Sequence, residues 1–308
     1  MTAITRHIVP LPGRPSLRLQ AGCAAALLCW ALGAKAADAP AVLTLLEGEA
    51  TLIIGARAYV AVSGARLGAG AIVETDAGTR LVRIEWPDGS LLDLGASTRV
   101  MLRPPLHRPA AQADPLFYLL RGWAKQTQTV TVSGQLSPAF DVQPFKGVLV
   151  SQVEGGTAVV FSEAGGAQVA GRQGVAPLPL RAGQAAVVDA GGNIKVLPRP
   201  PEGWLAALPR AFRDSLPNRA ERFKDANAVP EPRAALTYPA LQHWLVAEPD
   251  VRHEFPNRFG VLLSDRAFRS ALRQQLVRHP EWELALRPPR AAQAVRKLPA
   301  SNPQESAR

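Results

Sequence analysis

Cysteine, aromatic residues and long apolar runs are all scarce in this sequence. Its two cysteines, Cys23 and Cys29, both stand near the N-terminus. The chain beyond them therefore has no disulfide, no thiol nucleophile and no thiolate that could bind a metal. Aromatic residues make up only 6% of the chain. Beyond residue 36, no apolar run reaches the roughly 18–20 residues that span a bilayer, so we expect the processed chain to be soluble.

Glycine and proline are abundant instead, with 25 and 28 residues in a chain of 308. Many turn residues and few aromatics favour a turn-rich β protein over a long helical bundle. Hydrophobic residues make up 47% of the chain, which is enough for a packed core and argues against disorder throughout. The length predicts about two domains.

The N-terminus has the pattern of a secretory signal. Three arginines without an acidic residue precede Ala21–Ala34, a run of 14 uncharged and mostly apolar residues, and an A-x-A pattern then ends at Ala36. This order predicts export to a bacterial periplasm and cleavage after Ala36. The alternative is an uncleaved membrane anchor, for which the run of 14 residues is short.

Basic residues outnumber acidic residues by 35 to 25, which gives a net charge of +10. Residues 201–308 hold 17 Lys and Arg against 12 Asp and Glu, so much of the excess lies in the C-terminal third. This asymmetry favours an anionic partner for that part of the chain. An exported protein does not meet nucleic acid, which leaves an acidic protein or an anionic glycan.

The middle of the chain consists of short apolar or alternating runs that are broken by Gly and Asp. We predict strands at Val42–Leu46, Ala50–Ile54, Ala58–Val62, Ala71–Thr75, Arg80–Trp86, Ser90–Leu94 and Thr98–Leu102. Strands of about five residues at a spacing of 8–12 residues are typical of an all-β module. Asp88-Gly89 is a turn signal, because Gly readily takes a positive φ.

These residues resemble the FecR-type periplasmic domain. The resemblance is carried by Gly48, Gly55, Leu67, Gly70, Ile72, Thr75, Gly78, Asp88, Gly89, Ser90, Leu92, Leu94 and Thr98. Leu180-Arg181-Ala182-Gly183-Gln184-Ala185 resembles a later turn of that family. The chain departs from the pattern at Ala71, where the family often has Asp, and at Val153–Ala158, where it lacks the family's Arg-Gly-Thr-x-Phe step.

The resemblance implies a mainly β fold, a stacked β-solenoid or β-roll of short strands, from Val42 to Leu197. It gives a structural role to the turn residues Gly70, Thr75, Gly78, Asp88, Gly89, Ser90, Gly183 and Gln184. Further strands are expected at Leu116–Ala124, Thr127–Val132, Ala139–Val142, Val148–Val153 and Ala185–Val188.

The C-terminal third forms a smaller, proline-punctuated helical region. Pro198–Pro201 is a stiff linker. Thr237 can cap one helix, and Ser264 can cap the longest one, Ser264–Arg278. We therefore divide the chain into a signal peptide (1–36), a FecR-like β domain (37–197), a helical region (198–290) and a disordered tail (291–308).

The large aromatic side chains of the helical region are expected to form its core or its seam with the β domain. These residues are Trp204, Tyr238, Trp244, Phe255, Phe259, Phe268 and Trp282.

No motif for catalysis, a cofactor or a metal stands out. The histidines lack metal-site spacing, and neither a G-x-S-x-G elbow nor a P-loop occurs. Glu85, Asp88 and Asp93 form a cluster of carboxylates in the sequence. We interpret Asp88 as a turn residue, and we expect Glu85 and Asp93 to face solvent across a hairpin rather than to act as a glycosidase pair.

Four residues are candidates for contact with a partner. Arg266, Arg269 and Arg273 share one stripe of the expected helix, and Trp123 lies on a strand. The stripe fits an anionic polymer or an acidic protein face. It also fits the solvated face of a helix that packs through Phe268 and Leu272.

The family resemblance implies a role in envelope signalling through protein contacts. In its regulatory members, a cytoplasmic domain acts on a sigma factor. Only 20 residues precede the apolar run here, so we do not carry over that activity. We expect a non-enzymatic periplasmic adaptor without a cofactor. The alternatives are a module that binds peptidoglycan or exported polysaccharide through exposed Trp86 or Trp123, and an enzyme with a polar cleft.

We predict that the chain recovered from the periplasm begins at Ala37, because the signal is cut after Ala36. Intact-mass measurement of the purified protein checks this. Recovery of the full-length chain from the cytosol would contradict it.

Overall fold

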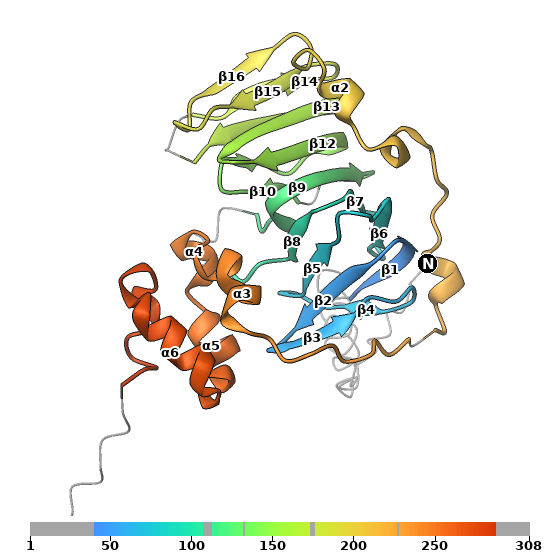
Figure 1. Cartoon of the computed structure of the whole chain (residues 1–308). Helices are drawn as coiled ribbons and strands as arrows, with labels where there is room; N and C mark the ends of the chain where they lie inside the picture. Colours follow the sequence, from blue (N-terminus) through green and yellow to red (C-terminus); the bar gives the residue numbers. More distant parts are fainter. Residues whose placement is uncertain (1–39, 107–112, 132, 173–175, 227, 288–308) are drawn as a thin grey trace, which may run out of the picture. The chain divides into compact units, whose positions relative to one another are not determined.

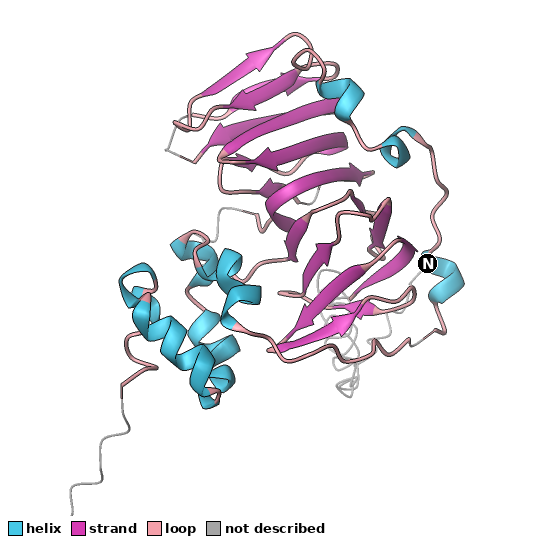
Figure 2. Ribbon diagram, viewed as in Figure 1, coloured by secondary structure: helices cyan, strands magenta, loops and turns pink. Residues whose placement is uncertain are grey.

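The computed structural model describes residues 40–106, 113–131, 133–172, 176–226 and 228–287. The expected signal peptide (1–36) and tail (291–308) lie outside the described residues. Sixteen strands of the described part join one continuous network of paired strands (Figure 1). Helices concentrate in the C-terminal region (Figure 2). The expectation of a mainly β chain with a smaller helical C-terminal region is confirmed.

Seven of the first eight strands lie close to the positions expected from the sequence, and the two-residue strand Arg66–Leu67 was not expected. The eight strands are β1 (Ala41–Glu47), β2 (Ala50–Ile54), β3 (Arg57–Val60), β4 (Arg66–Leu67), β5 (Ile72–Thr75), β6 (Leu81–Glu85), β7 (Leu91–Leu94) and β8 (Arg99–Leu102). The β6–β7 hairpin turns at Asp88-Gly89, where Gly89 has a φ of +82° and the Asp88 carboxylate accepts a hydrogen bond from the Ser90 amide. The turn reading of Asp88 is thereby confirmed.

The second half differs more from the prediction. It contains β9 (Phe117–Gln128), β10 (Gln135–Leu136), β11 (Phe140–Val142), β12 (Lys146–Glu154), β13 (Thr157–Gly171), β14 (Leu178–Arg181), β15 (Ala185–Val188) and β16 (Ile194–Leu197). The separate strand at Thr127–Val132 is wrong, because β9 continues through Gln128 and its last residues pair with both β7 and β12. The 15-residue strand β13 was missed.

Neighbouring strands pair antiparallel, and among the described residues only β9 and β10 pair in parallel. The side chains of one face form a continuous apolar core that runs from Leu43 and Val82 to Val160 and Val188. Strand β6 lies between β1 and β7, and all five of its residues are buried. Val82 and Ile84 point into the core, so something else must cover Leu81, Arg83 and Glu85 on the opposite face.

Two glycines allow close approach where strands bend. Gly122 in β9 has a φ of +97°, and a Cβ there would lie 2.5 Å from the Cα of Thr98. Gly48, after β1, has a φ of +117°, and a Cβ there would lie 2.6 Å from the Cα of Thr79. Both positions need a residue without a side chain.

The C-terminal helices cover the sheet at β2, β3, β5, β8, β9 and β10 and share a core with it. They are α3 (Tyr238–Leu245), α4 (Pro249–Arg252), α5 (Phe255–Phe259) and α6 (Arg266–Gln274), with 3-10 helices η3 (Gly260–Ser264), η4 (Leu276–Arg278) and η5 (Pro280–Trp282). Six of the seven aromatic residues expected there lie in this cluster, beside Ile53, Ile72 and Met101 of the strands. They form both the core of the helices and their seam with the sheet.

Side-chain caps were predicted for two helices, and one of these two predictions is confirmed. Thr237 caps α3, as expected, by accepting from the Ala240 amide. Asp265 caps α6 by accepting from the Phe268 amide at 2.7 Å, and the prediction of Ser264 is wrong. Ser264 ends η3 and donates to Val261 instead. None of the helices in the described ranges has the length and apolar character needed to cross a bilayer.

Arg258 fastens α5 to the turns of the sheet. Its guanidinium donates to the carbonyl oxygens of Gly55, Gly70 and Ile53 at 2.9, 2.6 and 3.0 Å. Burial lowers the pKa of Arg258 to about 10. The predicted motif residue Gly70, with a φ of +74°, thus presents its carbonyl to a cation from the helical region.

The chain also covers one edge of the sheet with its own backbone. The Val60 amide in β3 donates to Glu231, and the Arg233 amide donates to Ala58, both at 2.8 Å. Tyr59 and Pro232 form an antiparallel bridge between these bonds. Residues 231–233 therefore extend the sheet by one short pairing beyond β3.

We predict that Gly122→Ala destabilises the fold more than Gly155→Ala. Both glycines have a positive φ, which costs an alanine roughly 1–2 kcal/mol. Around Gly155 no described atom lies within 4 Å of an added Cβ, whereas the clash at Thr98 adds about 1–3 kcal/mol at Gly122. Urea unfolding of both variants checks this, and equal losses would show that the approach to Thr98 is not constrained.

Candidate functional site

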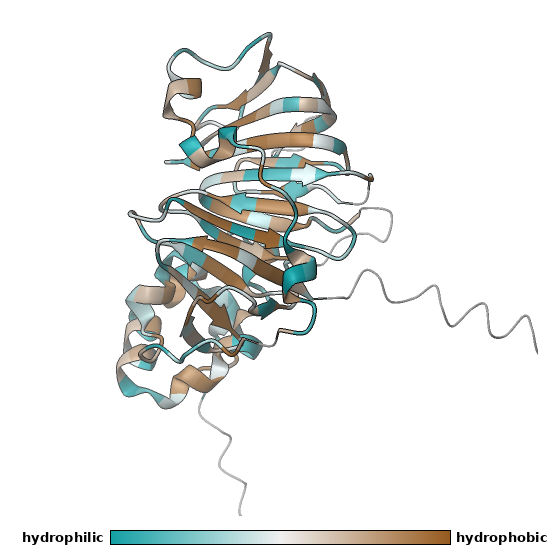
Figure 3. Cartoon of the chain, turned by 90° about the vertical axis from the view of Figure 1, so that its right-hand side faces the viewer, coloured by the Kyte–Doolittle hydropathy of each residue, from teal (hydrophilic) through white to brown (hydrophobic). Residues whose placement is uncertain are grey.

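A long connecting segment crosses the outer face of the sheet. We call residues 199–226 the strap; it contains α2 (Trp204–Ala207) and the 3-10 helices η1 (Arg210–Arg213) and η2 (Ala220–Phe223). It runs across the strands on the side that faces the viewer in Figure 3. The strap covers the side chains of β6 that point away from the main core. The candidate site consists of the strap and the residues beneath it.

Two aromatic side chains anchor the first half of the strap. Trp204 packs against Trp123 of β9, with ring centroids 5.1 Å apart, and against Phe161 of β13 at 5.8 Å. Phe212 is 1% exposed and belongs to the same apolar cluster as Leu81 and Val150. These anchors contact the face opposite to the main core.

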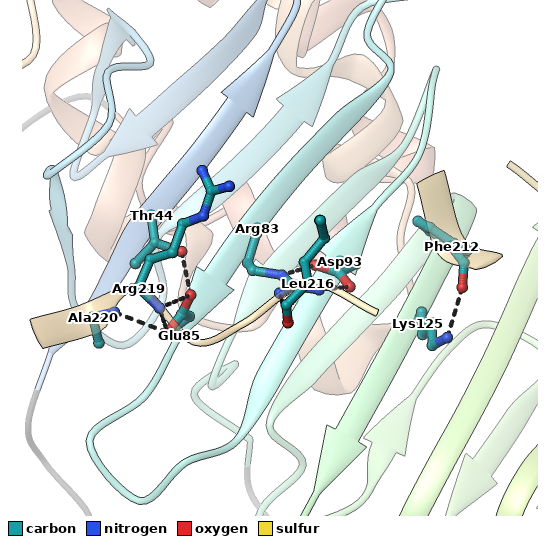
Figure 4. Close-up of polar contacts among 9 residues, drawn as sticks. All are labelled: Thr44, Arg83, Glu85, Asp93, Lys125, Phe212, Leu216, Arg219 and Ala220. Carbon is teal, nitrogen blue, oxygen red and sulfur yellow. Dashed lines mark hydrogen bonds and ion pairs between the residues drawn. The ribbon is translucent and has the colours of Figure 1, made fainter. Parts of the chain in front are cut away.

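An ion pair under the strap joins two adjacent strands. The guanidinium of Arg83 (β6) binds the carboxylate of Asp93 (β7) with two hydrogen bonds of 2.7 Å (Figure 4). Its Nη1 donates to the carbonyl oxygen of Leu216 in the strap at 2.9 Å. Burial acts to lower the pKa of Arg83, but the hydrogen bond and charge of Asp93 outweigh it and raise that pKa above its usual value.

Glu85 holds the strap through main-chain amides. Its carboxylate is 1% exposed and accepts from the Arg219 amide at 2.9 Å and from the Ala220 amide at 3.0 Å. The hydroxyl of Thr44 in β1 donates a third bond at 2.6 Å. Glu85 thus caps the first turn of η2 from the sheet, a role that a residue before the turn usually fills.

Lys125 of β9 is a further charged residue beneath the strap. Its ammonium donates to the carbonyl oxygen of Phe212 at 2.6 Å and forms an ion pair with Glu163 at 2.9 Å. We call Arg83, Glu85, Asp93 and Lys125 the polar row. Three of its members bind the strap, at Phe212, at Leu216 and at the amides of residues 219 and 220 (Figure 4).

The expectation that Glu85 and Asp93 face each other in solvent is wrong. The register pairs Glu85 with Leu91 and Asp93 with Arg83. Asp93 is 4% exposed, because the strap covers this face. The alternation of β6 gave the correct face for these side chains, but no local signal showed that a segment some 130 residues later would cover them.

The motif residues of the β part have structural roles. The Thr75 hydroxyl donates to the Gly95 carbonyl at 2.6 Å and accepts from the Thr98 amide at 2.8 Å. Gly183 has a φ of +83°, and the Gln184 side chain accepts from the Arg181 amide at 2.9 Å. Gly78, in contrast, is one of the glycines without a positive φ.

The predicted contact residues do not lie together. Trp123 belongs to the strap site, whereas Arg266, Arg269 and Arg273 lie on α6. Arg269 donates to Leu263 at 2.8 Å and Arg273 to Leu286 at 3.4 Å, so both guanidiniums bind the helical region itself. Trp86 is 3% exposed, and Trp123 packs against Trp204 with tilted rings. Neither tryptophan offers an open face to a sugar.

The histidines of the described residues do not gather with other metal ligands, since no group of three or more His, Asp or Glu that could hold a metal occurs there. His279 is buried between Tyr238 and the Leu245 carbonyl, at 2.8 and 3.0 Å. Burial lowers its pKa, which suits a neutral ring that donates to the carbonyl and accepts from the tyrosine.

Comparison with known proteins gives only distant likenesses. No family model matches the sequence, and no curated protein matches it either. Two crystal structures of a candidate anti-sigma factor from Parabacteroides distasonis are similar to the chain, each with a TM-score of 0.36 and 15% identity. The match covers 44% of this chain and 62% and 64% of the neighbours' chains, so it spans less than two thirds of their length. A likeness at this level carries no functional argument.

We predict that Asp93→Asn lowers the free energy of unfolding by about 3–5 kcal/mol, because it leaves the buried guanidinium of Arg83 without its counter-charge. The matched control is Glu154→Gln, which breaks the Arg121–Glu154 pair. Its side chains are 51% and 63% exposed, and its loss should cost less than about 1 kcal/mol. Chemical denaturation of both variants measures the difference, and losses of similar size would contradict the buried role of Asp93.

Proposed function

We propose that this chain is an exported FecR-like binding protein that acts as an adaptor in cell-envelope signalling or assembly. It works through contacts with another protein, without catalysis and without a cofactor. In this proposal its β part is a FecR-type β-roll or solenoid. The secretory pattern that ends at Ala36 supports export, and the motif from Gly48 to Gln184 supports the family.

The strap is the observation that carries the proposal. Arg83, Glu85 and Lys125 direct their charged groups at main-chain atoms of the strap. A face that already binds polypeptide backbone in this way is suited to protein recognition. The same contacts occupy the groups that an acid–base mechanism would need, which favours binding over catalysis.

The role in signalling rests on the family resemblance. Because sigma-factor regulation belongs to a separate domain in the family's regulatory members, it is not part of the proposal. The partner is a protein of the cell envelope. Of the four predicted contact residues, Trp123 supports an interaction at the strap. Arg266, an exposed residue of the α6 stripe, supports a second contact with an acidic surface.

We predict cross-linking to one envelope protein in intact cells. A photo-reactive amino acid is placed at Leu205 in the strap, which is 48% exposed, and at Val277 after α6, which is 98% exposed. A contact surface captures one envelope protein reproducibly, at the strap position, at the α6 position or at both, and mass spectrometry identifies that protein.

The matched control is the chain without residues 1–36, which stays in the cytosol. An adaptor is contradicted if both positions capture the same broad set of proteins, or if neither captures any. Sedimentation of the purified chain with cell-wall sacculi would instead support the glycan-binding alternative.

A further inference from the structure

The contacts of the strap have the character of a bound peptide. The polar row forms hydrogen bonds with two carbonyl oxygens and two amides of the strap. These are groups that every polypeptide carries. Trp204 and Phe212, eight residues apart, insert the largest side chains into the apolar cluster beneath, and Leu208, Ala211 and Leu216 pack against it. The face therefore recognises the main chain of a segment that has short helical turns and two aromatic anchors.

The order of these groups also fixes a direction. Along the strap, Lys125 and Arg83 donate to carbonyl oxygens first, and Glu85 then accepts from amides. A segment that lies in the opposite direction would place its groups differently against the three charges. Direction and anchor spacing are the features by which a sheet face selects a peptide.

The strap contributes no strand to the sheet beneath it. Residues 199–226 contain no strand, and their longest helices have four residues. Between the contacts at Phe212 and Leu216, residues Arg213, Asp214 and Ser215 are exposed. Segments with few regular hydrogen bonds and few buried side chains open locally at a lower free energy than the strands beneath them.

From these observations we propose that the outer face of β6, β7, β9, β12 and β13 is a docking surface for a segment of a partner protein that has short helical turns and two aromatic anchors, and that the strap occupies this surface as an internal competitor. Displacement of the strap exposes the polar row and the side chains of Trp123 and Phe161 to the partner. This inference rests on the proposed function, since it takes the occupant to be a protein.

The test uses a fluorescent peptide of residues 203–221 and the processed full chain. In the wild type the strap competes at an effective concentration on the order of millimolar, as for any tethered ligand. The variant Trp204→Ala/Phe212→Ala lacks both anchors and leaves the face unchanged. We expect it to bind the peptide roughly ten- to hundred-fold more tightly than the wild type.

Two matched controls isolate the contacts. Leu205→Ala changes an exposed strap residue and should leave the affinity at the wild-type value. A peptide with N-methyl groups at the amides of Arg219 and Ala220 should bind the double variant about ten-fold more weakly, because Glu85 then loses both donors. An N-methyl group at Ser215, whose amide takes no part in the contacts with the polar row, should have no effect.

Equal affinity of the wild type and the double variant would overturn the proposal, as would a lack of binding to a double variant that circular dichroism shows to be folded. Wild-type dimers that depend on Trp204 and Phe212 would identify a second copy as the occupant and would also overturn it.

If the double variant does not fold, the proposal is tested by amide hydrogen exchange of the wild-type chain. The amides of Arg219 and Ala220 should exchange by local opening, well before those that join β12 and β13. Exchange of all of them together, only on global unfolding, would overturn the proposal. Peptide binding in vitro without a cross-linked partner in cells would contradict the adaptor function, but it would still support the docking surface.

Discussion

The structure depends on a strap of main chain that lies over charged side chains. A carboxylate or guanidinium withdrawn from water costs several kcal/mol unless it is paired and hydrogen-bonded. Glu85 meets this condition with three donors, and Arg83 with a bidentate carboxylate and a carbonyl. Because three of these partners belong to the strap, the strap and the charged side chains stabilise each other's positions. The path of the chain from β16 to α3 follows from this dependence.

The same arrangement separates the molecule into three apolar clusters. The main core lies on one face of the strands, the strap covers the opposite face at Leu81 and Val150, and the helices cover Ile53, Ile72 and Met101. Four of the aromatic residues lie in the main core, at Trp86, Phe117, Phe140 and Phe145, and others lie where a segment outside the sheet packs against it. Trp204 and Phe212 fix the strap, and Trp244 and Trp282 fix the helices.

Features set by neighbouring residues were predictable, and features set by distant residues were not. The alternation of β6, the turn at Asp88 and the cap at Thr237 involve residues a few positions apart. The burial of Glu85 results from residues 219 and 220, and local polarity at Glu85 and Asp93 pointed to solvent. Strand β13 was missed, and it bends at Gly165, which has a φ of +80°. Helix α6 begins one residue after the expected position, because Asp265 rather than Ser264 caps it.

Residues 231–233 have a consequence beyond local stability. They pair with β3, so the main-chain groups of Ala58 and Val60 are already used within the chain. An unpaired strand margin is a template for edge-to-edge pairing with another copy of the chain. The last stretch of backbone before the helices thus closes the margin of β3 to such pairing, at no cost to the faces of the sheet.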